Sequence, residues 1–260
     1  MGRSFSQLGT VLIWVSIVLY ALMAAKLIKD RLDTKYRFFL FYLISNVIGL
    51  LLTQAVPWPR EEYFQFWILF QTVNWVLAAL MVIELLHLML AEYPGLRKTG
   101  KVLLLSAISF ALVLSIATLG IDFPADVFSQ RTVAIAAVVH RAILFNLVIF
   151  LFVILVGLSW FPIQLSNNLK IHASLMFLVF FFEGLANLLR NQVGAQLTEI
   201  LTVCLFVFTI VVLTVWLLKM SVDGELINST SGSRVLSGKE QMLLLQMRAL
   251  DQALQRSLRK

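Results

Sequence analysis

The chain has 260 residues, of which 60% are hydrophobic and 13% charged, and its formal net charge is +7. A soluble domain carries about 25% charged residues, so the composition excludes an ordinary soluble globular protein. The basic residues flank apolar segments, which favours contact with anionic lipid headgroups over binding of nucleic acid. The single cysteine, Cys204, excludes an intrachain disulfide and a cysteine-based zinc site.

Seven apolar segments follow one another along the chain, each near the roughly 20 residues that a helix needs to cross a bilayer. They are expected at 8–28, 37–56, 63–91, 102–121, 132–158, 169–190 and 196–219. Helices are expected because lipid offers no hydrogen-bond partner to free backbone groups, and no segment alternates as a membrane barrel strand does. The predicted fold is an all-α membrane protein, with a seven-transmembrane helix bundle over residues 1–219.

The distribution of lysine and arginine between the connections predicts the orientation of this bundle. One side carries nine basic residues, which are Lys26, Lys29, Arg31, Lys35, Arg37, Arg97, Lys98, Lys101 and Lys170. The other side carries four, which are Arg3, Arg60, Arg131 and Arg190. Since basic connections stay in the cytoplasm, we expect the N-terminus outside and the C-terminus in the cytoplasm.

Charged residues at membrane depth are costly and are therefore candidates for function. Glu183, Asn187 and Arg190 share one face of the sixth segment, and His140 and Arg141 lie at a similar depth in the fifth. The spacing predicts an ion pair between Arg141 and Glu183. This pair is either a staple between two helices or part of an outward-opening pocket for a small polar or anionic ligand. The residues expected in that pocket are Glu183, Arg141, His140, Asn187, Gln71 and Glu199.

A second polar group lies near the predicted inner end of the third segment. Glu84 and His87 have the Glu-x-x-His spacing of di-iron bundles, but such sites need two of these motifs and the chain has one. We therefore expect Glu84 to pair with first-loop bases such as Arg37. Three asparagines near mid-span, Asn46, Asn74 and Asn146, are expected to hydrogen-bond to neighbouring helices.

No metal and no cofactor are expected. The chain has three histidines, and their predicted depths in the membrane differ by on the order of 10–15 Å. One zinc ion needs all its ligands at about 2 Å, so these histidines cannot share it. The seventh segment has no lysine between Ala195 and Leu218 for the Schiff base of a retinal pigment.

The C-terminal tail changes composition after the last apolar segment. Residues 220–237 are expected to be a flexible linker, and the capping-box pattern that starts at Ser237 predicts an amphipathic helix over 238–260. Its apolar stripe is Leu236, Leu243, Met247, Leu250 and Leu254. The helix is expected to lie on the cytoplasmic leaflet, to bind a partner or a second copy through 238–258, or to pack back on the bundle.

Loose motifs connect the chain with a protein family. Tyr63-Phe64-x-x-Trp67, Glu84 and Tyr93-Pro94-Gly95-Leu96-Arg97 resemble those of uncharacterised bacterial seven-transmembrane proteins of similar length. The chain is also distantly similar to the seven-span sensor modules of bacterial histidine kinases, without the kinase core. The resemblance implies a location in the bacterial inner membrane.

These observations together favour a receptor-like or sensory membrane protein over an enzyme. A ligand would bind in the outer half of the bundle, and the tail helix would report to a cytoplasmic partner. The alternatives are a scaffold or assembly subunit of a membrane complex and a small-solute transporter. A closed, dry Arg141–Glu183 pair would favour the scaffold, and a polar tunnel reaching Glu84 would favour the transporter.

Overall fold

The structure of the chain is a computed structural model that describes residues 2–57, 59–122, 131–160, 165–190, 195–225 and 238–257. The described residues form helices and short connections, and they contain no strand. The helices are α1 (Gly2–Lys29), α2 (Arg37–Ala55), α3 (Arg60–Met89), α4 (Pro94–Asp122), α5 (Arg131–Trp160), α6 (Asn167–Arg190), α7 (Ala195–Lys219), the 3₁₀ turn η1 (Asp223–Glu225) and α8 (Gly238–Ser257). The predicted all-α class is confirmed.

Six of the described helices are long and apolar enough to cross a membrane, namely α1, α2, α3, α5, α6 and α7. Each coincides with a predicted apolar segment, and together they fit an integral multi-pass membrane protein. The fourth predicted segment, 102–121, lies within α4. That helix begins earlier than predicted, at Pro94, because proline suits the first position of a helix and the basic residues of the connection continue the same helix.

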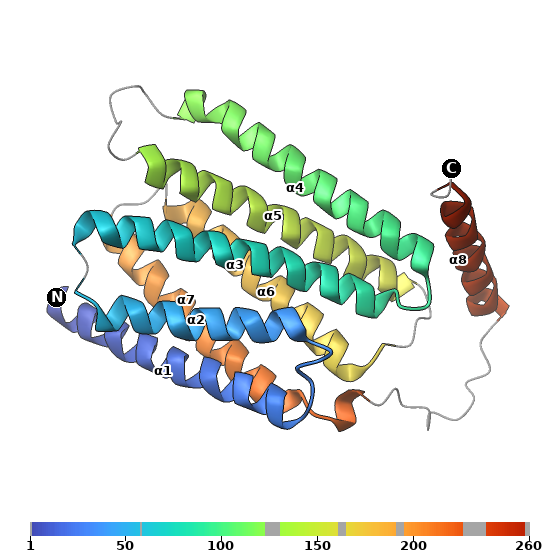
Figure 1. Cartoon of the computed structure of the whole chain (residues 1–260), viewed down its shortest axis with the longest axis horizontal. Helices are drawn as coiled ribbons and strands as arrows, with labels where there is room; N and C mark the ends of the chain where they lie inside the picture. Colours follow the sequence, from blue (N-terminus) through green and yellow to red (C-terminus); the bar gives the residue numbers. More distant parts are fainter. Residues whose placement is uncertain are drawn as a thin grey trace.

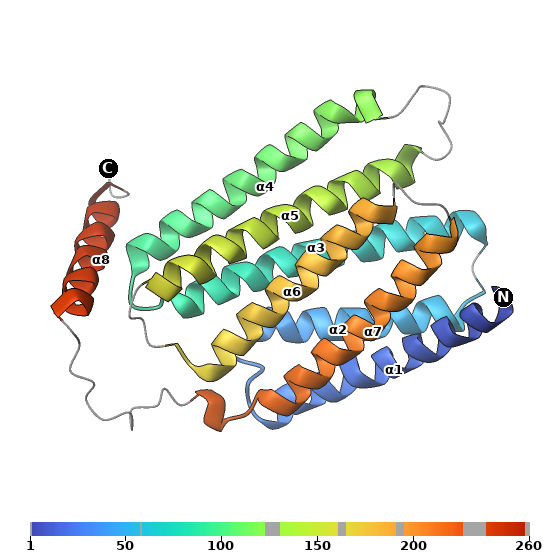
Figure 2. The ribbon, with the colours of Figure 1, turned by 180° about the vertical axis from the view of Figure 1, so that it is seen from behind.

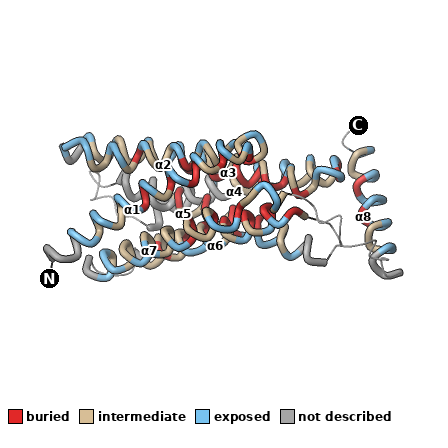
Figure 3. The backbone as a smooth tube through the Cα atoms, turned by 90° about the horizontal axis from the view of Figure 1, so that it is seen from below, coloured by how far each residue is buried: buried red, intermediate tan, exposed pale blue. Residues whose placement is uncertain are grey.

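The six apolar helices form a closed ring in the order α1, α2, α3, α5, α6, α7, with α7 packed against α1 (Figure 1). The helix α4 lies outside this ring, where it packs on α5 and on α3 (Figure 2). The core of large buried side chains therefore lies between the helices of this ring. Figure 3 colours the buried residues along the backbone, and they gather on stretches that run beside other helices.

The two faces of α1 show how the ring buries its core. Tyr20, Met23 and Leu27 are buried and follow one another at three or four residues, as expected for one face of a helix. The opposite face exposes Val11, Trp14, Val18 and Leu22. Since both faces are apolar, and lipid tails are as apolar as these side chains, the exposed stripe suits contact with lipid.

A group of polar contacts closes the ring at the end where α1 meets α2. Asn168, at the start of α6, donates hydrogen bonds to the Ser221 carbonyl oxygen at 2.6 Å and to Glu225 Oε1 at 2.7 Å. Tyr36 also donates to Glu225 Oε1, at 2.7 Å, and Lys35 forms an ion pair with the same carboxylate. Within the predicted linker, Asp223–Glu225 form the 3₁₀ turn η1, and the contacts of Ser221 and Glu225 tie this segment to the first connection and to α6. Residues 226–237 of that linker lie outside the described residues.

The tail helix α8 packs on the start of α4, at the end of the bundle where α3 meets α4 (Figure 1). Asp251 is buried, and its Oδ1 atom accepts a hydrogen bond from the Leu96 backbone nitrogen at 2.8 Å. A carboxylate at this position satisfies a free N–H and suits the positive end of the α4 dipole. Gln255 holds the other oxygen, Oδ2, at 2.7 Å.

Of the three positions predicted for the tail, the structure shows α8 packed back on the bundle, and contact of this helix with lipid or with a partner stays a prediction. The contact face also differs from the predicted apolar stripe. Met247 is buried as expected, but Leu250 is exposed, and Asp251, which was placed off the stripe, faces α4. The hydrogen bond of Asp251 to the α4 N-terminus accounts for this rotation, since the carboxylate must face the free N–H groups.

Candidate functional site

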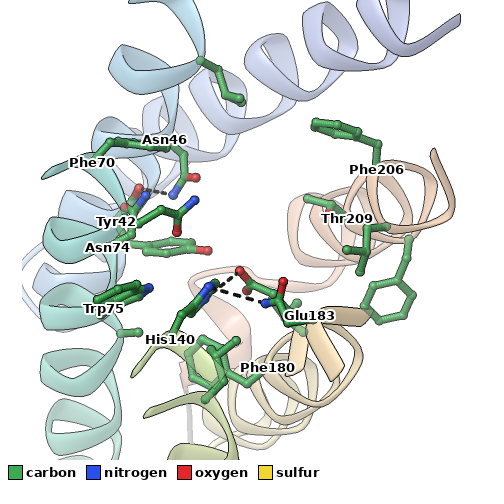
Figure 4. A pocket seen from close by; sticks show the side chains of 18 of the residues that line it. Tyr42, Asn46, Phe70, Asn74, Trp75, His140, Phe180, Glu183, Phe206 and Thr209 are labelled. Carbon is green, nitrogen blue, oxygen red and sulfur yellow. Dashed lines mark hydrogen bonds and ion pairs between the residues drawn. The ribbon is translucent and has the colours of Figure 1, made fainter. Parts of the chain in front are cut away.

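A cavity of about 280 Å³ lies inside the ring and is lined by all six of its helices (Figure 4). Its polar lining residues are Tyr20, Tyr42, Asn46, Gln71, Asn74, His140, Glu183, Asn187, Thr202 and Thr209. Its aromatic walls are Trp67, Phe70, Trp75, Phe180, Phe206 and Phe208. The described side chains of α4 contribute nothing to this lining, in agreement with its position outside the ring. The cavity combines an apolar wall with a few polar groups, as small-molecule sites do.

Three residues from α5 and α6 form a connected polar group on one side of the cavity. His140 Nε2 lies 3.3 Å from Glu183 Oε1, and the Asn187 amide nitrogen lies 3.4 Å from His140 Nδ1. The Asn187 amide nitrogen can donate to Nδ1 in the tautomer that carries its ring proton on Nε2, and that Nε2–H then points to Glu183.

The surroundings hold His140 in place and leave Glu183 accessible. The ring of His140 stacks on that of Trp75 with 5.1 Å between centroids, and its side chain is only 7% exposed. The side chain of Glu183, by contrast, is 32% exposed. Figure 4 shows Glu183 directed toward the open space between α6 and α3. The carboxylate is therefore the charged group that a molecule in the cavity could reach.

Two polar atoms next to this space have no hydrogen-bond partner in the described chain. They are Asn74 Oδ1 and Trp75 Nε1, and both residues are more than nine-tenths buried. Leaving a buried donor or acceptor unsatisfied costs about 1–3 kcal/mol for each group. Since both residues line the cavity, a molecule bound there could satisfy one acceptor and one donor.

The structure brings four of the predicted pocket residues together and leaves two outside. Glu183, His140, Asn187 and Gln71 line the cavity, whereas Arg141 and Glu199 are not part of its lining. The predicted ion pair between Arg141 and Glu183 is wrong, because Glu183 pairs with His140. Successive residues point about 100° apart around a helix. His140 therefore faces the cavity and Arg141 points away from it.

Several lining residues were not predicted from the sequence as site residues. Among them are two mid-span asparagines, whose polar side chains in an apolar segment are a sequence signal for a site. The amide nitrogens of Asn46 and Asn146 donate to carbonyl oxygens of their own helices, those of Tyr42 and Ala142, at 2.8 Å each. The predicted hydrogen bonds to neighbouring helices are therefore wrong for these two amide nitrogens. Asn46 and Asn74 instead face the cavity, so polar residues at mid-span could have indicated a site as well as helix packing.

Glu84 and His87, near the end of α3, do not form a joint site. Glu84 accepts hydrogen bonds from the backbone nitrogens of Arg37 at 2.9 Å and Phe38 at 3.2 Å, and so caps the start of α2. Arg37 is a partner of Glu84 as predicted, but the contact is made by the Arg37 backbone nitrogen and not by its guanidinium group. His87 is exposed. The described residues contain no group of three or more side chains that could hold a metal ion.

The contacts of Glu225, which lies outside the apolar helices, shift the pKa of its own carboxyl group and that of the Tyr36 hydroxyl. Burial alone would raise the pKa of the Glu225 carboxyl, but hydrogen bonds from Lys35, Tyr36 and Asn168 and the charge of Lys35 lower it below its usual value. Burial, together with the hydrogen bond to Glu225 and its negative charge, raises the pKa of the Tyr36 hydroxyl. Both shifts hold Glu225 charged and Tyr36 protonated as a donor.

Comparison of the chain with family models, with curated proteins and with solved structures finds no match. The resemblance to bacterial seven-transmembrane proteins therefore stays a prediction, and the site is interpreted from its geometry.

Proposed function

We propose that this protein is a receptor-like or sensory membrane protein that binds a small ligand in the cavity inside its helix ring. The tail helix α8 would report the bound state to a cytoplasmic partner. The observation that carries the proposal is the cavity of about 280 Å³ with unsatisfied polar atoms of Asn74 and Trp75 beside it. A helix bundle that served only as a scaffold would gain stability by filling this space.

The packing beyond the cavity supports a binding site rather than a transport path. One or two turns nearer the first connection, Phe39, His172 and Trp216 fill the ring, with centroids 4.4 Å apart for Phe39 and His172 and 4.7 Å for Phe39 and Trp216. All three side chains are buried. Glu84, which a tunnel to the inner end would reach, is not part of the cavity lining.

Two helices connect the cavity with the polar contacts at the end of the ring. The helix α6 carries Glu183 into the cavity and Asn168 into the contacts with Ser221 and Glu225. The helix α7 carries Thr209 into the cavity and leads directly into the same contacts. A ligand that moved α6 relative to α7 would therefore disturb the connection that leads to α8.

The proposal includes a seven-span topology with α4 as the additional crossing. The nine basic residues at the end that carries α8 support a cytoplasmic location for that end. The opposite end of the ring, nearer Asn187, would then face outward and give the ligand its entry. This topology is the one expected of a bacterial inner-membrane protein with its N-terminus outside.

The test uses the purified protein in lipid nanodiscs and a set of small amines, alcohols, sugars and carboxylates. We expect at least one class to raise the unfolding temperature of the wild type. The same compound should have no effect on Thr209→Phe, which places a ring in the cavity. Val207→Phe is the matched control, because it adds the same ring to an exposed position of α7 and should keep the effect.

The reporting role is tested in the same samples with two spin labels. In a Cys204→Ser background, labels at Thr34→Cys and Gln252→Cys measure the distance from the first connection to α8. We expect the stabilising compound to change this distance. A temperature shift that persists in Thr209→Phe would place binding outside the cavity, and binding without a distance change would contradict the reporting role.

A further inference from the structure

The charge of the cavity lining selects between classes of ligand. Among the residues whose side chains the structure describes, the lining includes one carboxylate, Glu183, and one imidazole, His140, and no lysine or arginine. A carboxylate with no lysine or arginine beside it gives this part of the lining a negative character. An anion would be repelled by Glu183 in a low-dielectric space whose described lining offers no lysine or arginine. The expectation of an anionic ligand depended on Arg141, which lies outside the lining.

The walls of the cavity supply a second attraction for positive charge. Trp67, Phe70 and Phe206 line it from α3 and α7, and Phe180 lies beside Glu183 on α6 (Figure 4). The face of an aromatic ring attracts a cation within about 6 Å, more strongly when water is excluded. One accessible carboxylate among aromatic rings therefore matches an ammonium group better than a neutral one.

The two buried polar atoms without a hydrogen-bond partner in the described chain, Asn74 Oδ1 and Trp75 Nε1, restrict the class of ligand further. Asn74 Oδ1 is a buried acceptor without a donor, and Glu183 is an accessible acceptor in the same cavity. A protonated primary amine has three N–H donors and can serve both, whereas a quaternary ammonium has none. Trp75 Nε1–H is a donor without an acceptor, which an oxygen on the ligand could satisfy.

We infer that the cavity binds a small organic amine in its protonated form, with the ammonium group between Glu183 and Asn74. The volume of about 280 Å³ lies just below the range of about 300–1,000 Å³ for small-molecule sites. It suits a molecule with one small ring or a short chain. This inference rests on the proposed function, since it names the ligand class of the same cavity.

Four probes that share a phenyl ring and differ in charge or in N–H donors test the inference on the wild type in nanodiscs. They are benzylamine, benzyl alcohol, benzoate and benzyltrimethylammonium. Calorimetry gives the Kd, and quenching of tryptophan fluorescence reports contact with the cavity wall. We expect benzylamine to bind most tightly, benzyltrimethylammonium and benzyl alcohol more weakly, and benzoate not at all.

A carboxylate variant with a matched control completes the test. Glu183→Gln should weaken benzylamine by about 10- to 100-fold, as expected for a lost hydrogen bond to a charged group, and leave benzyl alcohol nearly unchanged. Glu199→Gln removes an exposed carboxylate of α7 outside the lining and should change neither Kd. The ranking of the probes on the wild type stays decisive even where Glu183→Gln fails to fold.

The outcomes separate this inference from the function on which it rests. Binding of benzoate or benzyl alcohol as tight as that of benzylamine would overturn the amine while leaving a ligand cavity in place. Equal weakening of all probes by Glu183→Gln would also overturn it, because the carboxylate would then act on the fold rather than on charge. Failure of every probe to bind the wild type would contradict the inference and the cavity proposal together.

Discussion

At the scale of single residues, the side of the helix on which a polar side chain lies decides whether it enters the core. His140 and Arg141 are neighbours in sequence, yet His140 pairs with Glu183 inside the ring and Arg141 does not. The same applies to Glu84, whose carboxylate turns toward the start of α2 and accepts its free backbone N–H groups. Each of these contacts depends on a helix next to the residue and not on the neighbours in its own sequence.

Glu84 should stabilise the fold as the cap of α2. Glu84→Ala leaves the backbone nitrogens of Arg37 and Phe38 without this acceptor and should cost about 0.5–2 kcal/mol, the usual range for a lost helix cap. Glu84→Gln keeps an acceptor oxygen and should cost less. Thermal unfolding in nanodiscs measures both, with Glu92→Gln, an exposed carboxylate nearby, as the control. Equal stability of wild type and Glu84→Ala would contradict the capping role.

Glu225 should make stability depend on pH in the acidic range. Its pKa is lower in the folded protein than the reference value of 4.5. A lowered folded pKa adds stability that is complete above the unfolded pKa and is lost as pH falls through the folded value. Unfolding temperatures measured from pH 7 downward should therefore fall below about pH 4.5 in the wild type.

The variant Glu225→Gln should lose that part of the pH dependence and about 1 kcal/mol of stability near pH 7, since the Lys35 pair is partly exposed. Asp223→Asn, an exposed carboxylate in the same turn, is the matched control and should behave as the wild type. A variant with an unchanged acid slope would show that Glu225 does not carry it.

At the scale of elements, the contact between α4 and α8 depends on the absence of a side chain at Gly95. A Cβ atom there would lie 2.5 Å from the Asp251 carbonyl oxygen and 2.9 Å from Asp251 Oδ1. The backbones of the two helices approach so closely that only glycine fits. In the motif Pro94-Gly95-Leu96, the proline therefore begins α4 and the glycine lets α8 approach closely. The backbone N–H of the leucine donates to the carboxylate of Asp251.

Gly95→Ala should release α8 without disturbing the ring. Hydrogen exchange of the 238–257 segment should become faster, while exchange in α1 and α7 stays slow. Gly9→Ala is the control, because a Cβ atom there meets nothing within 4 Å. Asp251→Asn should act in the same direction as Gly95→Ala and more weakly, since an amide oxygen can still accept from Leu96. Unchanged exchange in α8 of Gly95→Ala would rule out this packing.

At the scale of the whole molecule, the ring of six helices has an inner surface and an outer surface, and both are rich in apolar side chains. The inner surface carries the cavity, and the outer one carries exposed residues such as Val18, Phe41 and Leu218. One end of the bundle carries nine basic residues in or beside its connections and the other end carries four, and α8 lies at the end with nine (Figure 1). This arrangement makes the orientation in the membrane testable without a ligand.

The proposed orientation predicts which connections an impermeant maleimide reaches from outside intact bacterial cells. In a Cys204→Ser background, Glu62→Cys should be labelled, and Asp33→Cys and Lys98→Cys should be labelled only after lysis. If α4 crosses the membrane, Asp126→Cys should be labelled like Glu62→Cys. Labelling of Lys98→Cys in intact cells would reverse the orientation, and protection of Asp126→Cys would remove the crossing by α4.

The helices and several cavity residues could be predicted from the sequence for one physical reason. A segment in lipid must satisfy its own backbone, so apolar length alone indicates a helix, and all six apolar helices of the ring lie at predicted segments. The expense of polar groups at membrane depth likewise singled out Glu183, His140 and Asn187. The partner of Glu183 could not be predicted, because depth along a helix says nothing about rotation between two helices.

The sequence by itself determined the all-α class, the multi-pass character and the amphipathic tail, because these follow from apolar length and helical period. Only the tertiary structure decided the order of the helices around the ring, the position of α4 outside it and the packing of α8 on Gly95. It also decided that Glu183 meets a histidine instead of an arginine, which changed the expected charge of the ligand. The physical reason is that apolar helices can pack on any side in lipid, and contacts between helices select one arrangement.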